Sequence, residues 1–199
     1  MEWYMILALI GTGLAAGFIN TNAGGGSMLT LPLLMFLGIP ANVANGTNRI
    51  AILLQNVIGV KTFRQNGLLD FRTDYRLAIP AIIGSIVGAL FAVEINTELL
   101  EKVIAGLMIA MLFLVLLKPN AWVRKHADSV NKKPTVLQYF IFFLIGLYGG
   151  FIQMGVGFFL LAGLVLGSGY DLIKANAVKV FIVLIYTVFS LGIFVYHQQ

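Results

Sequence analysis

The chain contains no cysteine, which excludes disulfide bonds, thiolate metal ligands and cysteine nucleophiles. Charged residues are scarce, at 11% of 199 residues, whereas an average soluble domain has about 25%. Neither histidine lies in the middle of an apolar segment, and no Asp or Glu lies deep in one. The chain also lacks the Walker A pattern of ATP-driven pumps. These absences argue against a metal site, an intramembrane enzyme and a carboxylate site for H⁺ or Na⁺.

Hydrophobic residues, by contrast, make up 59% of the chain, and the mean hydropathy is +0.93. They form apolar segments at 3–21, 25–38, 43–60, 77–94, 99–117, 136–153, 157–168 and 177–196. A membrane span needs roughly 20 mainly apolar residues, and backbone inside a bilayer must satisfy its own hydrogen bonds. We therefore expect an all-α integral membrane protein with about eight transmembrane or half-membrane helices. Segments 25–38 and 157–168 are too short for straight spans, so they should be half-helices or arms of re-entrant hairpins.

The positive charges are concentrated beside these segments. Nine of the 13 Lys and Arg residues lie in two short loops, at positions 61, 64, 72 and 76 and at positions 118, 124, 125, 132 and 133. Basic clusters next to membrane spans primarily set topology, with the basic loops in the cytoplasm. We therefore expect no nucleic-acid partner. Loops 61–76 and 118–135 should be cytoplasmic, and tracing the chain back places the N-terminus outside.

Two stretches of the chain resemble each other. "GLAAGFINTNAG" at 13–24 aligns with "GLYGGFIQMGVG" at 146–157, sharing Gly, Leu, Gly, Phe, Ile and Gly at one offset. "GIPANVANGTN" at 38–48 aligns more weakly with "GYDLIKANAVK" at 169–179, after two residues are dropped. Because an odd number of apolar segments separates the repeat starts, the two copies should insert in opposite orientation. Inverted repeats with interrupted helices at matching positions are typical of secondary transporters.

The repeat divides the chain into three parts. These are a first transmembrane repeat at 1–118, a basic cytoplasmic loop at 119–135 and a second, inverted repeat at 136–199. We expect the second copy to be incomplete, because after its matching stretch it has one apolar segment where the first copy continues through two further spans. Such a chain is either a truncated, inactive fragment or a naturally short relative.

The polar, glycine-rich stretch from Asn20 to Ser27 lies inside a long uncharged part of the chain. Three consecutive glycines weaken a helix by roughly 1 kcal/mol each relative to alanine, so we expect the helix to break there. A helix that starts near Gly26 would aim its free amides and positive dipole end at a bound anion. The candidate substrate-binding residues are Asn20, Asn22, Gly24, Gly25, Gly26 and Ser27 in the first break and Gln153, Gly155 and Gly157 in the second.

Glycine also allows helices to pack closely. We favour that role for the glycine pairs with a spacing of four residues, which are Gly13–Gly17, Gly84–Gly88, Gly146–Gly150 and Gly163–Gly167.

A second set of candidate substrate-binding residues follows each break. It consists of Asn45, Thr47, Asn48 and Arg49 in the first copy and Asn176 and Lys179 in the second. Charges near the membrane are expensive, and they are usually functional or extend to the lipid headgroups. Arg49 and Lys179 are therefore expected either to counter the charge of an anion or to extend to headgroups, and the sequence favours neither. Gln55 and Asn56 are expected to hydrogen-bond a neighbouring helix rather than line a path.

Two long stretches carry a resemblance to a known family. "GFINTNAGGGSMLTLPLLMFLGIPANVANGTNRIAILLQN" and, after a basic loop, "GFIQMGVGFFLLAGLVLGSGYDLIKANAVKV" resemble the sulfite exporter TauE/SafE family. The resemblance extends over nearly the whole chain, and the Gly-rich stretch followed by Ala-Asn-Gly-Thr-Asn is fairly specific. It implies a multi-pass protein of the bacterial cytoplasmic membrane that moves sulfite, sulfonates or related organic anions. The chain departs from the pattern by ending early and by carrying Val178-Lys179 where the first copy has Thr47-Asn48.

We interpret the chain as a secondary transporter or facilitator for small anions, in which two inverted halves alternate access around a central site at the broken helices. The resemblance, rather than the charge pattern, implies sulfite or organosulfonates as substrates. The expected partners are a small anionic substrate and the lipid bilayer, with no cofactor and no metal; a homo-oligomer is left open. The alternative is a membrane structural or assembly protein, which would need glycine packing faces but not paired polar helix breaks.

Overall fold

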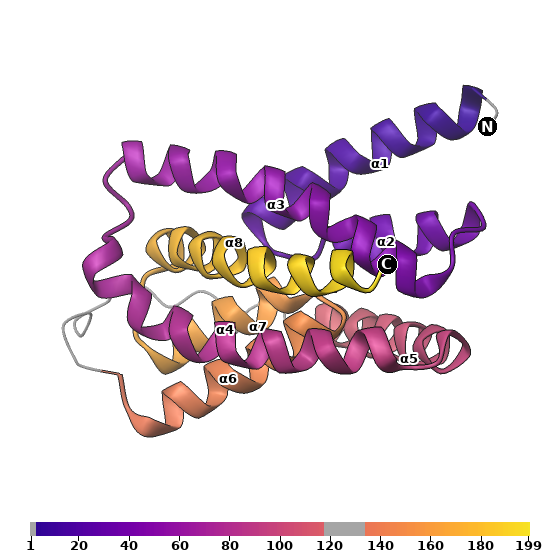
Figure 1. Ribbon diagram of the computed structural model, residues 1–199. Helices are drawn as coiled ribbons and strands as arrows, with labels where there is room; N and C mark the ends of the chain where they lie inside the picture. The colour runs from indigo at the N-terminus through magenta and orange to yellow at the C-terminus, as the bar shows by residue number, and fades with distance from the viewer. Residues whose placement is uncertain (1–2, 118–133) are drawn as a thin grey trace.

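The computed structural model describes residues 3–117 and 134–199, with the side chains of all except residues 72, 73, 112 and 114–117. Within these ranges the chain is all-helical (Figure 1). In chain order the elements are α1 (Trp3–Asn22), α2 (Ser27–Phe36), α3 (Ala41–Gln65), α4 (Phe71–Glu94), α5 (Thr97–Leu117), α6 (Val136–Phe151), α7 (Val156–Ala162), the π-helical turn η1 (Gly163–Gly167) and α8 (Leu172–Tyr196). Each predicted apolar segment corresponds to one α-helix, so the all-α fold class is confirmed. The basic loop predicted at 119–135 lies almost entirely outside the described residues.

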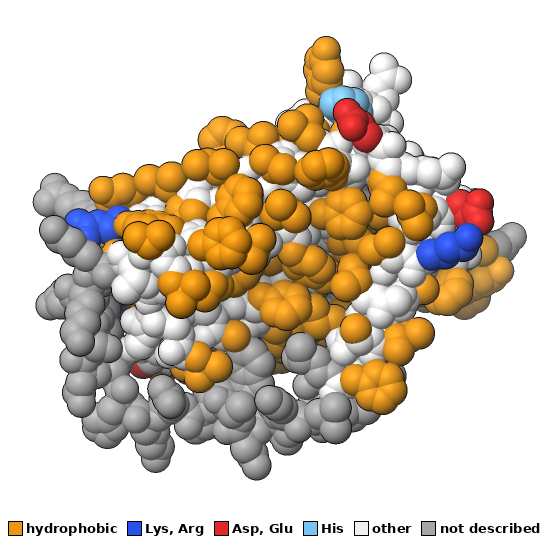
Figure 2. All heavy atoms as spheres, turned by 90° about the horizontal axis from the view of Figure 1, so that it is seen from below, with side chains coloured by type: hydrophobic (Ala, Val, Ile, Leu, Met, Phe, Trp, Pro, Cys, Tyr) orange, Lys and Arg blue, Asp and Glu red, His pale blue; other side chains and the backbone are white. Residues whose placement is uncertain are grey.

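Three of the described helices are long and apolar enough to cross a bilayer: α1, residues Asp74–Glu94 of α4, and α8. The helices also carry many exposed large hydrophobic side chains, including Ile83 on α4, Ile109 on α5 and Phe140 on α6. Figure 2 shows one face covered mostly by such side chains, with the charged groups gathered towards its edges. Exposed apolar surface on this scale belongs in lipid, and the chain is a membrane-embedded protein.

The tightest helix pair is α4 with α6, which run parallel and in contact. A Cβ on Gly84 or Gly88 of α4 would overlap the backbone of α6, and one on Gly146 or Gly150 of α6 would overlap the backbone of α4. The predicted packing role is therefore confirmed for these two pairs, because only glycine allows the two backbones to approach so closely.

The packing role is wrong for Gly13 and Gly167. Neither has an atom within 4 Å of an added Cβ, although Gly17 and Gly163 have neighbours at 3.8 and 3.3 Å. Gly13 lies on α1, of whose residues only Ala16 is buried. The four-residue spacing thus marks a helix contact only where a second helix presents a matching surface.

The centre of the molecule is formed by α8, which packs against α3, α4 and the α7–η1 segment. Figure 1 shows α1 and α3 running in one direction across the view and α6 and α8 in the opposite direction. In the sequence α1 precedes the first break and α3 is the long helix that follows it, and α6 and α8 stand in the same relation to the second break. The two sets of helices therefore cross the molecule with opposite polarity.

Candidate functional site

Both predicted helix breaks exist, and the structure brings them into direct contact. The first lies between Asn22 and Ser27, and the second between Phe151 and Val156. A Cβ on Gly24 would overlap the backbone of Gly157, and the converse holds as well. Gly24 also has φ +92°, a conformation that strains any side chain. Both positions therefore require glycine, and the two interrupted helices meet at this point.

The first break is closed by hydrogen bonds of its own chain. The amide of Gly26 donates to Asn20 Oδ1 at 2.6 Å, and a Cβ on Gly26 would overlap the carbonyl of Ala16. The expectation that the Gly26 amide is free for an anion is therefore wrong, because the Asn20 side chain occupies it. Gly26 instead allows the start of α2 to pack against α1.

Arg49 of α3 reaches the end of α6. Its guanidinium donates to the carbonyls of Gly149 at 3.2 Å, Gly150 at 2.6 Å and Phe151 at 3.3 Å, and to Ser190 Oγ at 3.0 Å. Asn45, one turn earlier on α3, donates to the Phe151 carbonyl at 2.8 Å. The last carbonyls of a helix have no partner within the helix, and a cation there also opposes the negative end of the helix dipole. Arg49 therefore caps the C-terminus of α6.

Lys179 of α8 does the same for α1. Its Nζ donates to the carbonyls of Asn20 at 2.9 Å and Thr21 at 3.1 Å, in the last turn before the first break. Arg49 is 0% exposed and Lys179 2% exposed, so neither extends to lipid headgroups, and that alternative is wrong for both. Each broken helix is held by a buried cation from the set of helices that flanks the other break.

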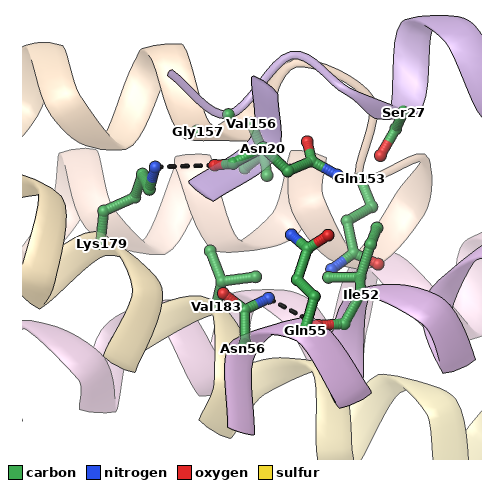
Figure 3. Close-up of a pocket in the computed structure, with 11 residues that line it drawn as sticks. Asn20, Ser27, Ile52, Gln55, Asn56, Gln153, Val156, Gly157, Lys179 and Val183 are labelled. Atoms are coloured by element: carbon green, nitrogen blue, oxygen red, sulfur yellow. Dashed lines mark hydrogen bonds between the residues drawn. The ribbon is translucent and has the colours of Figure 1, made fainter. Parts of the chain in front are cut away.

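A small, partly open cavity lies between the two breaks (Figure 3). Its lining residues are Asn20, Gly24, Ser27, Ile52, Gln55, Asn56, Gln153, Val156, Gly157, Lys179 and Val183. Figure 3 shows side chains from opposite sides pointing towards this space. The cavity volume is about 20 Å³, which is room for about one water molecule. An anion of four or more heavy atoms does not fit in it.

Lys179 is the only cation among the cavity-lining residues, and no carboxylate is among them. A lysine ammonium has three donors, and two of them are used by α1. The third has no partner among the described residues, at a position that borders the cavity. Gln153 contributes a second unsatisfied group: its Nε2 donates to Thr187 at 2.7 Å, while its buried Oε1 has no partner in the part of the chain that the structure describes.

The structure brings six of the predicted site residues together at the cavity: Asn20, Gly24, Ser27, Gln153, Gly157 and Lys179. The others lie elsewhere. Asn22 is exposed and donates to its own helix at Phe18, and Thr47 is exposed on the outer side of α3.

Four further predicted residues lie outside the cavity lining, and three of them support the breaks. Asn48 accepts a hydrogen bond of 2.6 Å from Thr30 of α2. Gly25 packs against the ring of Phe158. Gly155 begins α7 with φ +69°, and Asn176, half-buried on α8, has a buried Oδ1 with no partner among the described residues.

Sequence reasoning missed several residues of this region. Gln55 and Asn56 line the cavity, whereas hydrogen bonds to a neighbouring helix were expected; the Asn56 amide donates within α3, to Ile52, at 2.7 Å. Thr187 and Ser190 are fully buried on α8 and contact Gln153 and Arg49. The sequence did contain a signal for Thr187 and Ser190, because two hydroxyl side chains three residues apart share one face of an otherwise apolar helix.

A separate polar cluster joins the starts of α4 and α8. Asp74 accepts hydrogen bonds from Lys174 Nζ at 2.7 Å and from the Tyr170 hydroxyl at 3.3 Å. Burial, together with the nearby Asp74 carboxylate, raises the pKa of Tyr170 to about 12, so this hydroxyl stays protonated and able to donate. The cluster joins the start of α4 to the start of α8, on the side of the predicted cytoplasmic loop 61–76. Elsewhere in the described part of the chain, no group of three or more His, Asp or Glu residues is arranged to hold a metal ion.

Comparison with known proteins agrees with this architecture. The family described as "Sulfite exporter TauE/SafE" matches residues 9–199. A "Probable membrane transporter protein ORF9" from Sinorhizobium sp is 28% identical over 196 residues, which is 98% of this chain and 74% of the relative. A "Probable membrane transporter protein" from Haemophilus influenzae is 28% identical over 87% of this chain and 67% of its own length. The Escherichia coli "Probable membrane transporter protein YfcA" is 30% identical over 81% of this chain and 60% of the relative.

No solved structure matches the chain. The chain spans between 60% and 74% of the length of these three relatives. The family match, by contrast, covers almost all of the chain, including both helix breaks and both capping cations. The chain therefore belongs to the sulfite exporter TauE/SafE family of membrane transporters.

Proposed function

We propose that the protein is a secondary transporter or facilitator for small anions, with oxidised sulfur species such as sulfite or organosulfonates as the substrate class. The observation that carries the proposal is the small cavity between two broken helices, bordered by a buried lysine with an unused donor. A transporter needs a central polar site that both sides of the membrane can reach in turn, and broken helices are where such sites form.

The electrostatics of the cavity favour an anion. Lys179 is buried and faces no carboxylate among the lining residues, so its charge is balanced only by the dipoles of two carbonyls. An unbalanced charge inside a bilayer is costly, and an anion in the cavity would offset it. The start of α2 at Ser27 borders the same space, and a helix start carries partial positive charge.

Passage of an anion requires the cavity to enlarge. The backbone contact between Gly24 and Gly157 lies beside the cavity, so enlargement separates the two breaks. We propose that the first repeat and the second, inverted repeat move relative to each other around this contact. The opposite directions of α1 and α3 against α6 and α8 (Figure 1) support this arrangement, because inverted repeats are the usual basis of alternating access.

We place the protein in the bacterial cytoplasmic membrane, with the N-terminus outside. The support is the positive-inside rule, since the described basic residues Lys61, Arg64 and Arg76 all lie near the α3–α4 turn. The short α4–α5 turn at the other end of these helices carries Glu94 and Glu98.

The test is transport by the purified chain reconstituted in liposomes. Radiolabelled sulfite, sulfate and ethanesulfonate are offered with and without a proton gradient, and chloride flux is followed separately. We expect uptake of at least one of the sulfur oxyanions above that of empty liposomes. Absence of flux for all four anions would contradict the proposal.

A matched pair of variants ties transport to the cavity. Gln55→Leu removes an amide from the lining, whereas Gln65→Leu makes the same change at an exposed position at the end of α3. Loss of one hydrogen bond to a charged ligand is worth about 1.5–3 kcal/mol, so Gln55→Leu should lower kcat/KM by about 10-fold or more. Gln65→Leu should transport as the unaltered chain does. Equal activity of both variants would place the substrate path elsewhere.

A further inference from the structure

The two capping cations have similar roles but unequal surroundings. Arg49 holds α6 and Lys179 holds α1, each from a long helix that follows the other break. Both are buried, and if both only completed the fold, both would be expected to be held by similar contacts. They are not, and the difference indicates which half moves.

Arg49 is fixed in place. It donates four hydrogen bonds, to three carbonyls of α6 and to Ser190 of α8, and its guanidinium lies 4.3 Å from the centre of the Phe194 ring. It is absent from the cavity lining. The helix that it caps is itself in backbone contact with α4 through Gly146 and Gly150. An anion in the cavity cannot reach Arg49 without dismantling this packing.

Lys179 is held by much less. Its ammonium makes two hydrogen bonds, to the carbonyls of Asn20 and Thr21, and it borders the cavity. Figure 3 shows the side chain reaching across to the Asn20 carbonyl at the edge of the cavity. The helix that it caps is also loosely held, because Ala16 is the only buried residue of α1.

We propose that Lys179 is an exchangeable helix cap, which we call the latch. It holds the protein closed by donating hydrogen bonds to the end of α1, and the protein opens when an anion in the cavity binds the ammonium instead. The inference rests on the proposed function, since it supplies the link between substrate charge and opening. A lysine ammonium is a compact charge on a flexible stem, and it can turn from two carbonyls to an anion without leaving its site. A full negative charge attracts it more strongly than carbonyl dipoles do.

The consequence is an asymmetric motion. Loss of the Lys179 cap leaves the last carbonyls of α1 unpaired, so the arm formed by α1 and α2 separates from the second break. The α6–α7 arm stays in place because Arg49 is not released. A neutral molecule of the same size does not compete for the ammonium, and the latch stays closed. Substrate charge is thereby coupled to conformational change.

The first experiment is made without an anion. Amide hydrogen exchange is measured on the full chain in lipid nanodiscs for the unaltered protein, Lys179→Met and Lys179→Arg. The readout is the last turn of α1, where the amides of Ala23 and Gly24 both donate to the Ile19 carbonyl. Lys179→Met should speed exchange there by about tenfold or more, since it removes hydrogen bonds to a charged donor. Lys179→Arg, which can donate to the same carbonyls, should restore slow exchange.

The end of α6 is the internal control. The amide of Ile152 donates to the Tyr148 carbonyl at the corresponding place in the second break. It should exchange at the same rate in all three proteins. Unchanged exchange at α1 in Lys179→Met would overturn the latch, as would equal acceleration at both breaks, which would indicate general destabilisation.

The second experiment adds an anion to the unaltered protein. Sulfite and ethanesulfonate serve as probes, with ethyl methyl sulfone as the neutral counterpart of the sulfonate. An anion that the liposomes transport should speed exchange at the last turn of α1, the neutral sulfone should not, and Lys179→Met should not respond. Transport without this acceleration overturns the latch and leaves the proposed function intact, whereas absence of any transport contradicts the proposed function itself.

Discussion

Replacement of Arg49 by methionine tests the capping of α6 most directly. Arg49 is fully buried and donates to three consecutive helix-terminal carbonyls. In Arg49→Met the Phe151 carbonyl keeps its hydrogen bond from Asn45 at 2.8 Å. The carbonyls of Gly149 and Gly150 lose the guanidinium, in a part of the protein that water does not reach.

The magnitude follows from those two carbonyls. An unsatisfied buried polar group costs about 1–3 kcal/mol, so two of them cost about 2–6 kcal/mol. Methionine fills a similar volume and removes a charge from the interior, and the recovered desolvation energy offsets part of this cost. We therefore expect Arg49→Met to lower the free energy of unfolding by about 2 kcal/mol or more.

The assay is unfolding in mixed micelles with a rising mole fraction of sodium dodecyl sulfate, followed by circular dichroism. Arg64→Met is the matched control, because it is the same substitution on the same helix at an exposed position. Arg64 stacks on the Phe71 ring at 5.1 Å, an interaction worth about 0.5–1 kcal/mol at an exposed site. If Arg49→Met is no less stable than Arg64→Met, the guanidinium does not cap α6 and the reasoning fails.

Two further predictions concern the free energy of unfolding in the same micelle assay, and a third concerns the topology in membrane vesicles. Gly150→Ala should lower stability by about 1–3 kcal/mol because its methyl group would overlap the facing backbone of α4. Gly106→Ala, with no neighbour within 4 Å, should be neutral or slightly stabilising in the same unfolding assay, because alanine favours a helix over glycine. Asp74→Asn should lower stability by about 1–3 kcal/mol, because it removes the carboxylate that accepts from a lysine of α8 at 2.7 Å; unchanged unfolding would mean that this ion pair does not join α4 to α8. Because the chain has no native cysteine, a single introduced cysteine reports on which side of the membrane it lies. A membrane-impermeant maleimide should label Gln65→Cys, on the predicted cytoplasmic side, only in inverted vesicles. It should label Glu98→Cys, on the opposite side, only in right-side-out vesicles.

The number and type of the helices could be predicted from the sequence because the bilayer restricts a spanning chain to few structures. The helix starts could not. The third, fourth and eighth apolar segments were placed at 43, 77 and 177, whereas their helices begin at Ala41, Phe71 and Leu172. Hydropathy marks the part of a helix that lies in lipid, but the helix continues into polar turns. The last of these helices is capped by Asp171, whose side chain accepts from two backbone amides.

The candidate site could also be predicted only in part: the positions of the breaks could, but the partners of the charged residues could not. The first break could be located because a run of glycine inside an apolar segment is visible without a structure, and the internal repeat then located the second. The partners of the charged residues were not visible. Asn20 contributes a backbone carbonyl to Lys179, and a carbonyl leaves no trace in the identity of a residue. The burial of Arg49 was equally hidden, since its acceptors lie about 100 residues away in the sequence and are also carbonyls.

The reciprocal caps give the two helix breaks a common physical basis. A helix that stops inside a bilayer leaves its last carbonyls unpaired, and no water is present to satisfy them. Here each helix end is bound by a cation from beyond the other break, so in the proposed mechanism closing the cavity and pairing these carbonyls are the same event. A carrier that must reopen cannot fix both ends permanently, because every opening would then leave buried carbonyls without partners. It needs one permanent cap to hold the fold and one cap that a ligand can replace. Arg49, enclosed by α6, α8 and Phe194, meets the first requirement. Lys179, held by two hydrogen bonds and bordering the cavity, meets the second.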